Sequence, residues 1–111
     1  MTSPSPATET VVVVAVFTAA PGKLDALRSA LVEAIPGVHA EAGCELYAIH
    51  DAPDDQIYML EKWSSAAMLD AHAAGPAVAR LQQLTAGLTA GEVQVLRMTP
   101  IPAGSAEQGL L

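Results

Sequence analysis

The chain has 111 residues, about half of them hydrophobic, and its 5 basic and 12 acidic residues give a formal net charge of −7. A chain of this length forms one domain, which buries roughly two-thirds of the surface that its unfolded form exposes. The acidic balance argues against binding to nucleic-acid backbones or anionic membranes, because both need clustered Lys and Arg.

Cysteine content and the N-terminal segment bear on where the protein acts. Cys44 is the only cysteine, so the chain has no internal disulfide and no cysteine-rich metal site. The first ten residues lack the basic start and apolar core of a secretory signal, and no apolar run approaches the roughly 20 residues of a membrane span. These features predict a cytoplasmic protein.

The first half of the chain predicts a tail, a strand and a helix. Residues 1–10 mix Pro with small polar residues, which is typical of a disordered lead-in. Residues 11–18 are an apolar run dominated by β-branched Val, as in a strand buried on both faces. A helix is expected from about Lys23, with a kink or an end at Pro36-Gly37. Its apolar stripe consists of Leu24, Leu27, Leu31 and Ile35.

A hairpin is predicted from Gly43 to Trp63, with its turn at Pro53-Asp54-Asp55. Strand alternation divides the side chains between two faces. In the first strand, one face is expected to carry Cys44, Leu46, Ala48 and His50, and the other Glu45, Tyr47 and Ile49. In the second strand, one face is expected to carry Met59, Glu61 and Trp63, and the other Tyr58, Leu60 and Lys62.

The second half predicts a broken helix and a last strand. Ser64 or Ser65 is placed to cap a helix that contains Met68, Leu69 and His72. Gly75-Pro76 breaks this helix, and another is expected to follow. Residues 92–98 alternate as a strand does, and the Pro residues after them predict a loose arm over residues 100–111.

The resulting order, β-α-β-β-α-β, is that of the α+β ferredoxin-like fold, which has a four-stranded antiparallel sheet with helices on one face. The domain is expected to span residues 11–99. Alternate valines of the first strand, together with Tyr47, Ile49, Tyr58 and Leu60, would then leave an apolar patch on the helix-free face. Such a patch predicts a twofold homodimer that buries sheet against sheet.

Glu61 and Trp63 are two residues apart on one strand and therefore share a face. If that face lies under the helices, Glu61 is a carboxyl in apolar surroundings, where its pKa rises and proton transfer becomes favourable. The alternative is that Glu61 pairs with a neighbouring Lys or caps a backbone group while Trp63 belongs to the core.

The histidines offer a second source of chemistry. His72 on the helix and His50 on the hairpin would serve as base and partner if they converge, whereas a lone His on a half-buried helix is usually a packing residue. No His-x-x-x-His pair, Cys/His cluster or acidic triplet supports a metal, and no glycine-rich phosphate loop supports a nucleotide cofactor. Cys44 is interpreted as a small buried hydrophobe rather than a nucleophile.

Three groups of residues together resemble the antibiotic biosynthesis monooxygenase domain family over about residues 11–99. They are Pro21-Gly22-Lys23 after the Val-rich strand, Glu41-Ala42-Gly43-Cys44 with Tyr47 and His50, and Glu61-Lys62-Trp63-Ser64-Ser65 with Ala67 and His72. The resemblance implies a ferredoxin-like fold that pairs as a dimeric α+β barrel. It also implies oxidation of a phenolic or quinol-type polycyclic aromatic molecule by molecular oxygen, without a metal or any other cofactor.

Site residues follow from the resemblance and the pattern together. His72 and Glu61 are the expected catalytic residues, and the expected substrate-binding residues are Trp63, Met68, Leu69, His50 and Tyr47. The partners would be a small aromatic substrate, O2 and a second copy of the chain. The rival hypothesis is a non-enzymatic small-ligand-binding or stress-associated dimeric barrel. Convergence of Glu61, His72 and Trp63 on an open cavity would favour the enzyme, and a filled space there would favour the rival.

The chain also departs from parts of the family pattern. Relatives often carry a second His after the Pro that starts the next helix, where this chain has Ala77. Haem-degrading relatives place an Asn on the first strand and a haem-binding His on the later helix. This chain has Ala15 and approximately Gln82 at those positions, so the sequence predicts no haem degradation.

Overall fold

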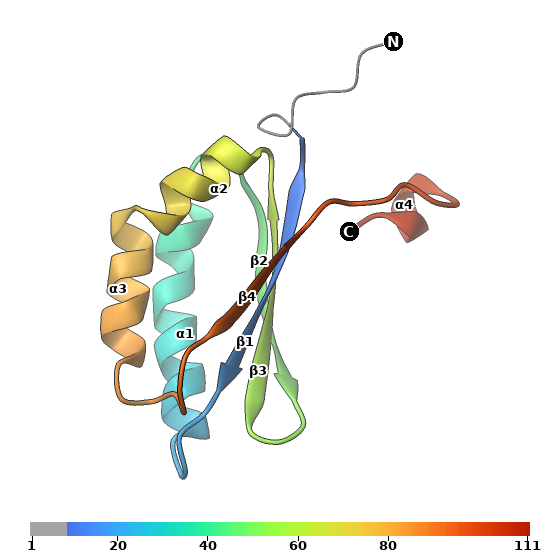
Figure 1. Ribbon diagram of the computed structural model, residues 1–111. Coiled ribbons are helices and arrows are strands. Elements are labelled where there is room, and N and C mark those ends of the chain that lie inside the picture. The colour runs from blue at the N-terminus through green and yellow to red at the C-terminus, as the bar shows by residue number, and fades with distance from the viewer. Residues whose placement is uncertain (1–8) are drawn as a thin grey trace.

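The computed structural model describes residues 9–111 (Figure 1). Most of the tail expected over residues 1–10 therefore lies outside the described residues. Four strands and four helices follow one another in the order β1 (Val11–Thr18), α1 (Leu24–His39), β2 (Cys44–Ala52), β3 (Gln56–Trp63), α2 (Ala66–Ala73), α3 (Pro76–Thr85), β4 (Gln94–Met98) and α4 (Ala106–Gly109).

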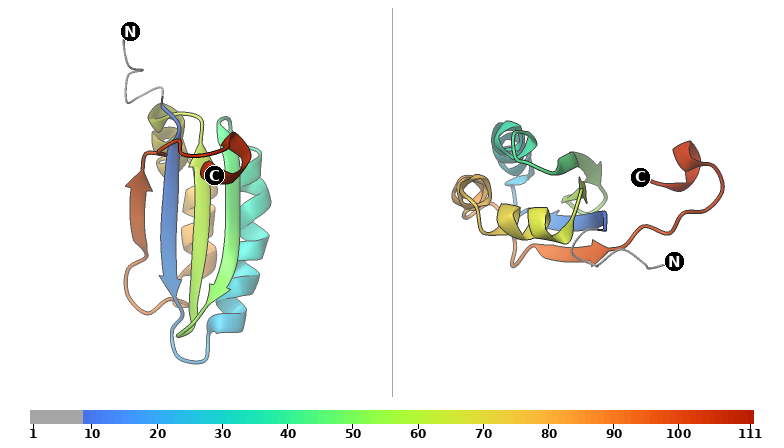
Figure 2. Two further views of the ribbon diagram at one scale, coloured as in Figure 1. Left: turned by 90° about the vertical axis from the view of Figure 1, so that its right-hand side faces the viewer. Right: turned by 90° about the horizontal axis from the view of Figure 1, so that it is seen from above.

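The sheet has the strand order β2-β3-β1-β4, and each neighbouring pair is antiparallel. Helices α1, α2 and α3 cover one face, here called the inner face (Figure 2). The ferredoxin-like α+β architecture expected from the sequence is therefore confirmed. Within residues 9–111, no helix is both long and apolar enough to cross a membrane.

Local sequence signals explain where the helices begin and end. The Ser65 hydroxyl accepts a hydrogen bond from the backbone N–H of Met68 at 3.2 Å, which caps α2 as expected. Pro76 occupies the first turn of α3, where its missing N–H costs nothing. Helix α1 continues past Pro36 to His39, and a backbone bond from Ala40 to the Pro36 carbonyl closes its last turn.

Strand register determines which residues meet on the inner face. Alternate residues of β1 point under the helices and are buried, among them Val13, Ala15 and Phe17. Val13 lies opposite Glu61 of β3, and Glu61 lies opposite Tyr47 of β2. Glu61, Met59 and Trp63 are therefore buried beneath the helices, and Tyr47 lies on the same face.

Two strand-face predictions for β2 are wrong. Tyr47 and Ile49 were expected on the helix-free face, but they lie opposite Glu61 and Met59 and pack against the core. A register shift between Cys44 and Leu46 places Cys44 opposite Trp63. Cys44 therefore lies on the inner face, whereas Leu46, Ala48 and His50 lie on the other face. A bulge adds one residue to the strand, so the side chains before and after it alternate in opposite phase. Strict alternation along the sequence does not predict where such a bulge occurs.

The helix-free side of the sheet is here called the outer face. It carries the alternate residues of all four strands: Val12, Val14 and Val16 of β1, Leu46, Ala48 and His50 of β2, Tyr58, Leu60 and Lys62 of β3, and Leu96 and Met98 of β4. The C-terminal arm with α4 lies on this side of the sheet (Figure 2). The arm is thus structured in part, by a single short helix.

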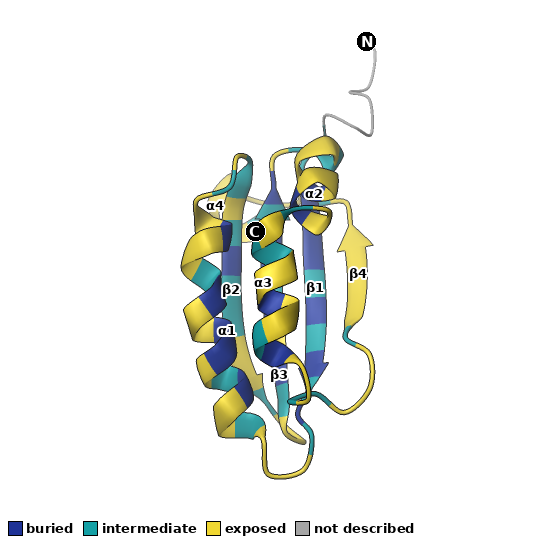
Figure 3. Cartoon of the chain, turned by 90° about the vertical axis from the view of Figure 1, so that its left-hand side faces the viewer, coloured by how far each residue is buried: buried dark blue, intermediate teal, exposed yellow. Residues whose placement is uncertain are grey.

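Strand β4 differs from the other three strands because all five of its residues are exposed. Helices α1 and α3 lie over β2, β3 and β1 and leave β4 uncovered, which Figure 3 shows as a strand exposed along its whole length. The inner face is consequently open at the β4 edge. This opening gives access to the site described next.

Candidate functional site

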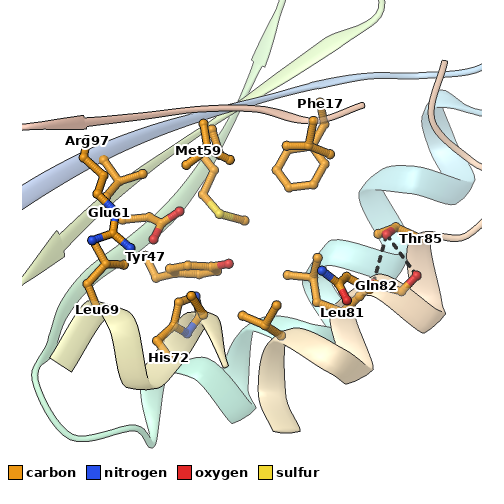
Figure 4. Close-up of a pocket in the computed structure, with 16 residues that line it drawn as sticks. Phe17, Tyr47, Met59, Glu61, Leu69, His72, Leu81, Gln82, Thr85 and Arg97 are labelled. Carbon is orange, nitrogen blue, oxygen red and sulfur yellow. Dashed lines mark hydrogen bonds between the residues drawn. The ribbon is translucent and has the colours of Figure 1, made fainter. Parts of the chain in front are cut away.

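A cavity of about 280 Å³ lies between the inner face of the sheet and helices α2 and α3 (Figure 4). Its size is close to the lower end of the roughly 300–1,000 Å³ that is usual for ligand pockets. Most of the wall is apolar, formed by Val13, Ala15, Phe17, Met59, Leu69, Ala73, Val78, Leu81, Val93 and Val95. The polar side chains in the wall are Tyr47, Glu61, His72, Gln82, Thr85 and Arg97.

Glu61 brings a carboxyl group into this apolar space. It is only 5% exposed, and the indole N–H of Trp63 donates a hydrogen bond to its Oε1 at 2.9 Å. Burial raises the pKa of Glu61, although the Trp63 hydrogen bond and the nearby His72 and Arg97 oppose the shift. Glu61 therefore holds a proton more readily than an exposed Glu does, and it is suited to accept and return one.

His72 is presented to the cavity by α2. Leu69 and His72 are one turn apart, so they share the buried face of this helix. The His72 ring lies 4.4 Å from the Trp63 ring and 5.5 Å from the Tyr47 ring, measured between centroids. Its Nδ1 lies 2.6 Å from Oε1 of Glu41, in the turn between α1 and β2.

Trp63 has a different position from the one expected. It is fully buried, but it does not line the cavity. It lies behind Glu61 and His72, hydrogen-bonded to the first and packed against the second. The three side chains do form one contiguous group, in which Trp63 supports two residues of the wall rather than contacting the space itself.

Of the remaining predicted site residues, two line the cavity and two do not. Tyr47 and Leu69 line the cavity. Met68 does not, and it is 40% exposed, because it lies about 100° around the helix from Leu69. His50 lies opposite Tyr58 on the outer face and is exposed, so the sheet separates it from His72.

Several polar groups at the site were not singled out from the sequence. Glu41 contacts His72 although it lies 31 positions earlier, and no local pattern links the two residues. Arg97 of β4 forms an ion pair of 2.8 Å with Asp70 of α2, across the open edge of the cavity. Arg97 pairs with Val13 of β1. If this register had been known, alternation along β4 would have placed Arg97 on the inner face.

Tyr47 adds a neutral hydroxyl to the wall. Burial raises the pKa of its phenol well above the ordinary value, so the group keeps its proton. Figure 4 shows its hydroxyl pointing along the cavity toward Leu81 and Gln82. Within residues 9–111, no cluster of three or more His, Cys, Asp or Glu side chains is arranged to hold a metal ion.

The chain is similar to several solved structures. Rv0793 from Mycobacterium tuberculosis is 26% identical, with a TM-score of 0.78, and the match covers 87% of this chain and 100% of that one. PA3566 from Pseudomonas aeruginosa is 29% identical, with a TM-score of 0.74 over 86% and 97% of the two chains. SO0527 from Shewanella oneidensis is 28% identical, with a TM-score of 0.70 over 82% and 92%.

A comparison with curated proteins finds no match. The family model described as antibiotic biosynthesis monooxygenase matches residues 10–84, which is about two thirds of the chain and includes Glu41, Glu61, Trp63 and His72. This match supports a general role in monooxygenation or in small-molecule binding. The chain therefore belongs to the antibiotic biosynthesis monooxygenase family.

Proposed function

We propose that the protein is a cofactor-independent monooxygenase that oxidises a phenolic or quinol-type aromatic molecule with O2. One observation carries the proposal: a buried carboxyl with a raised pKa, Glu61, lies in the wall of an open, mostly apolar cavity beside His72 and Tyr47. A carboxyl in such a setting is poised for proton transfer.

The cavity suits a flat aromatic ligand. Phe17, Met59 and Leu81 provide an apolar space for rings, and a thioether such as that of Met59 also makes favourable contacts with aromatic edges. Glu61, His72 and Tyr47 lie together at one end, so a phenolic hydroxyl would point there. The modest volume favours a small ring system over an extended one.

The reaction needs a proton acceptor and a dry pocket. Glu61 or His72 takes the proton of the substrate hydroxyl, and the electron pair of the broken O–H bond stays on the substrate oxygen. The resulting electron-rich anion transfers one electron to O2, and the two radicals join at a ring carbon as a peroxide. Loss of water, which takes the hydrogen of that ring carbon, leaves a carbonyl there. The O–H and the ring C–H of the substrate, together with O2, thus become two C=O groups and H2O.

Trp63 would contribute by holding the acid–base residues rather than by stacking on the substrate. Its N–H fixes the Glu61 carboxyl, and its ring packs against His72. The sequence suggested that Trp63 forms an aromatic wall of the pocket. Tyr47 suits this role better, because Tyr47 lines the cavity.

The active form would be a homodimer that pairs through the outer face. Val14, Val16 and Leu60 lie at the centre of that face, which Leu96 and Met98 extend with exposed apolar side chains. An apolar sheet face of this extent is typical of an interface between copies of a chain. Pairing of two such faces would give the dimeric α+β barrel.

The second candidate function is non-enzymatic binding of a small ligand. It is favoured by the hydrogen bonds that Glu61 and His72 already make, to Trp63 and Glu41 respectively. Side chains satisfied within the protein are typical of structural polar groups. Both candidates use the same cavity and differ only in whether a bound aromatic molecule reacts.

Oxygen uptake separates the two candidates. Purified protein would be incubated with a panel of hydroquinones and anthrones, with a chelator and without added cofactor. Uptake with formation of the quinone is expected, and His72→Ala should lower kcat by about 10²–10⁴-fold, the usual contribution of a positioned base.

Val32→Ala is the control, because Val32 is exposed on α1 and lies neither in the cavity wall nor on the outer face, so it should leave kcat unchanged. Saturable binding of a panel member without oxygen uptake would establish the binding function instead. Full activity in His72→Ala would remove His72 from the mechanism.

A further inference from the structure

Glu41 and His72 form a pair that connects two distant parts of the chain. Glu41 lies in the turn between α1 and β2, and its Oε1 is 2.6 Å from Nδ1 of His72 in α2. The His72 side chain is 6% exposed and that of Glu41 is 21% exposed. A short contact between a carboxylate and an imidazole N–H in such surroundings is a strong, charge-assisted hydrogen bond.

The end of α2 lies beside this pair. A Cβ at position 75 would lie 3.0 Å from the Ala71 carbonyl oxygen, which is a tight contact, and 3.5 Å from Oε2 of Glu41, which is an ordinary van der Waals contact. Gly75 is therefore a neighbour of the Glu41 carboxylate, and the space it leaves is needed within α2. The Gly75 N–H also donates to the His72 carbonyl oxygen, which fixes the backbone of the histidine.

Other groups around the His72 ring do not occupy its nitrogens. Trp63 and Tyr47 contact it through their rings, and the Glu61 carboxyl accepts its hydrogen bond from Trp63. Burial raises the pKa of the Cys44 thiol, so this group is neutral. Arg97 and Asp70 form an ion pair with each other at the cavity edge. Within residues 9–111, Glu41 is the one hydrogen-bond partner of the His72 ring.

We infer that Glu41 is the positioning residue of the site: it keeps the proton of His72 on Nδ1 and so leaves Nε2 as the free acceptor toward the cavity. Glu41 does not line the cavity and would not touch the substrate, whereas His72 does line it. The consequence for turnover rests on the proposed function, but the tautomer of His72 does not.

The pair would act in two steps of the proposed reaction. When the substrate O–H bond breaks, its proton forms the Nε2–H bond of His72, and the Glu41 carboxylate balances the positive charge of the imidazolium. The same proton then leaves Nε2 for the distal peroxide oxygen, which also takes the hydrogen of the attacked ring carbon and is released as water. A carboxylate that orients a histidine in this way sets its tautomer and stabilises its charged form.

Nitrogen NMR of histidine-labelled protein tests the tautomer without any substrate. In the wild type, His72 should show a protonated Nδ1 and an unprotonated Nε2. His39 provides an internal control, because its Nε2 lies 3.0 Å from the Tyr47 carbonyl oxygen, which only accepts, and it should show the opposite tautomer. Loss of one signal set in His72→Gln assigns the resonances.

Two variants of Glu41 then separate charge from hydrogen bonding. Glu41→Gln keeps an acceptor and should retain the Nδ1–H tautomer, whereas Glu41→Ala should give a mixture of the two tautomers. With a substrate found by oxygen uptake, both should lower kcat by about 10- to 100-fold, the usual effect of losing a partner that orients a histidine, with KM nearly unchanged. Glu45→Gln, at an exposed position of β2, is the matched control and should change neither quantity.

The possible outcomes are distinct. An Nε2–H tautomer in the wild type, or an unchanged tautomer in Glu41→Ala, would overturn the assignment. So would a kcat in Glu41→Ala equal to that of the wild type. A protein with the expected tautomer shift but no oxygen uptake with any panel member would uphold the role of Glu41 and reject the monooxygenase proposal.

Discussion

The two faces of the sheet are built from the same strands but hold different kinds of residue. Along β3, the inner face carries Met59, Glu61 and Trp63, all nearly or fully buried, while the outer face carries Tyr58, Leu60 and Lys62. The inner face thus combines a carboxyl, an indole and, from α2, an imidazole. The outer face in its central strands is mainly valine and leucine. One strand therefore supplies both the candidate chemistry and the candidate dimer surface.

This contrast shows what the helices add. On the inner face, α2 places His72 against Trp63 and removes Glu61 from water, which is why the pKa of Glu61 rises. On the outer face, no helix other than the short α4 of the C-terminal arm is present among the described residues, so within one chain no helix there shields a carboxyl as α2 shields Glu61.

The largest effect on stability should come from the buried indole. Trp63→Ala removes a fully buried ring and the donor to Glu61, so we expect a loss of about 3–5 kcal/mol in the free energy of unfolding, measured by urea denaturation. Trp63→Phe, which keeps an aromatic ring but not the N–H, should lose less. Val32→Ala on the exposed side of α1 is the control and should change stability by less than about 0.5 kcal/mol. Equal losses in Trp63→Ala and Val32→Ala would contradict the assignment of Trp63 to the core.

The outer face is tested by placing a charge at its centre. Leu60→Lys should weaken the proposed homodimer by at least about 100-fold, or about 2.7 kcal/mol, because the ammonium group would be buried against the partner sheet. Sedimentation over a range of concentrations measures the change. Ile49→Lys serves as the comparison, because Ile49 packs on the inner face and its replacement should unfold the chain rather than dissociate it. A wild type that sediments as a folded monomer at micromolar concentration would contradict the pairing.

Glu61 predicts a pH dependence of stability. Its pKa is raised in the folded protein, so the folded state binds this proton more tightly than the unfolded chain does. The resulting stabilisation is complete below the ordinary Glu value of about 4.3 and is lost as the pH rises through the raised pKa. Glu61→Gln, which still accepts from Trp63, should remove this loss. A tenfold difference in proton affinity between the folded and unfolded states corresponds to about 1.4 kcal/mol of unfolding free energy.

Urea denaturation between pH 4 and pH 8 compares the two proteins, and Glu45→Gln controls for the loss of an exposed carboxylate. Stability curves of wild type and Glu61→Gln that run parallel across this range would show that Glu61 titrates as an ordinary surface residue.

The smallest effect is expected at the cavity edge. Asp70→Asn breaks the ion pair with Arg97, in which the two side chains are 65% and 45% exposed. Exposed pairs of this kind contribute about 0–1 kcal/mol, so the free energy of unfolding should change by less than about 1 kcal/mol, and less still in high salt. A larger loss would show that β4 depends on this contact for its attachment to the inner layer.

The sequence by itself determined the order and type of the elements from β1 to β4, whereas the short α4 lies where a loose arm was predicted. Runs of β-branched residues, helical spacing of leucines and the Ser65 cap are local signals, and each is visible within about ten residues. They were sufficient for the ferredoxin-like topology and for the shared face of Glu61 and Trp63. They also predicted that Leu69 and His72 are neighbours on one helix face, because side chains three positions apart lie on the same side of a helix.

Tertiary structure decided the rest, because it depends on pairings between distant residues. The bulge near Cys44 and the register of β2 against β3 moved Tyr47 to the cavity and left His50 on the opposite face. Packing of α2 on β3 set Trp63 behind the wall, and the turn after α1 brought Glu41 to His72. Alternation fixes relative sides within a strand, but only contacts between strands and helices fix which side is buried.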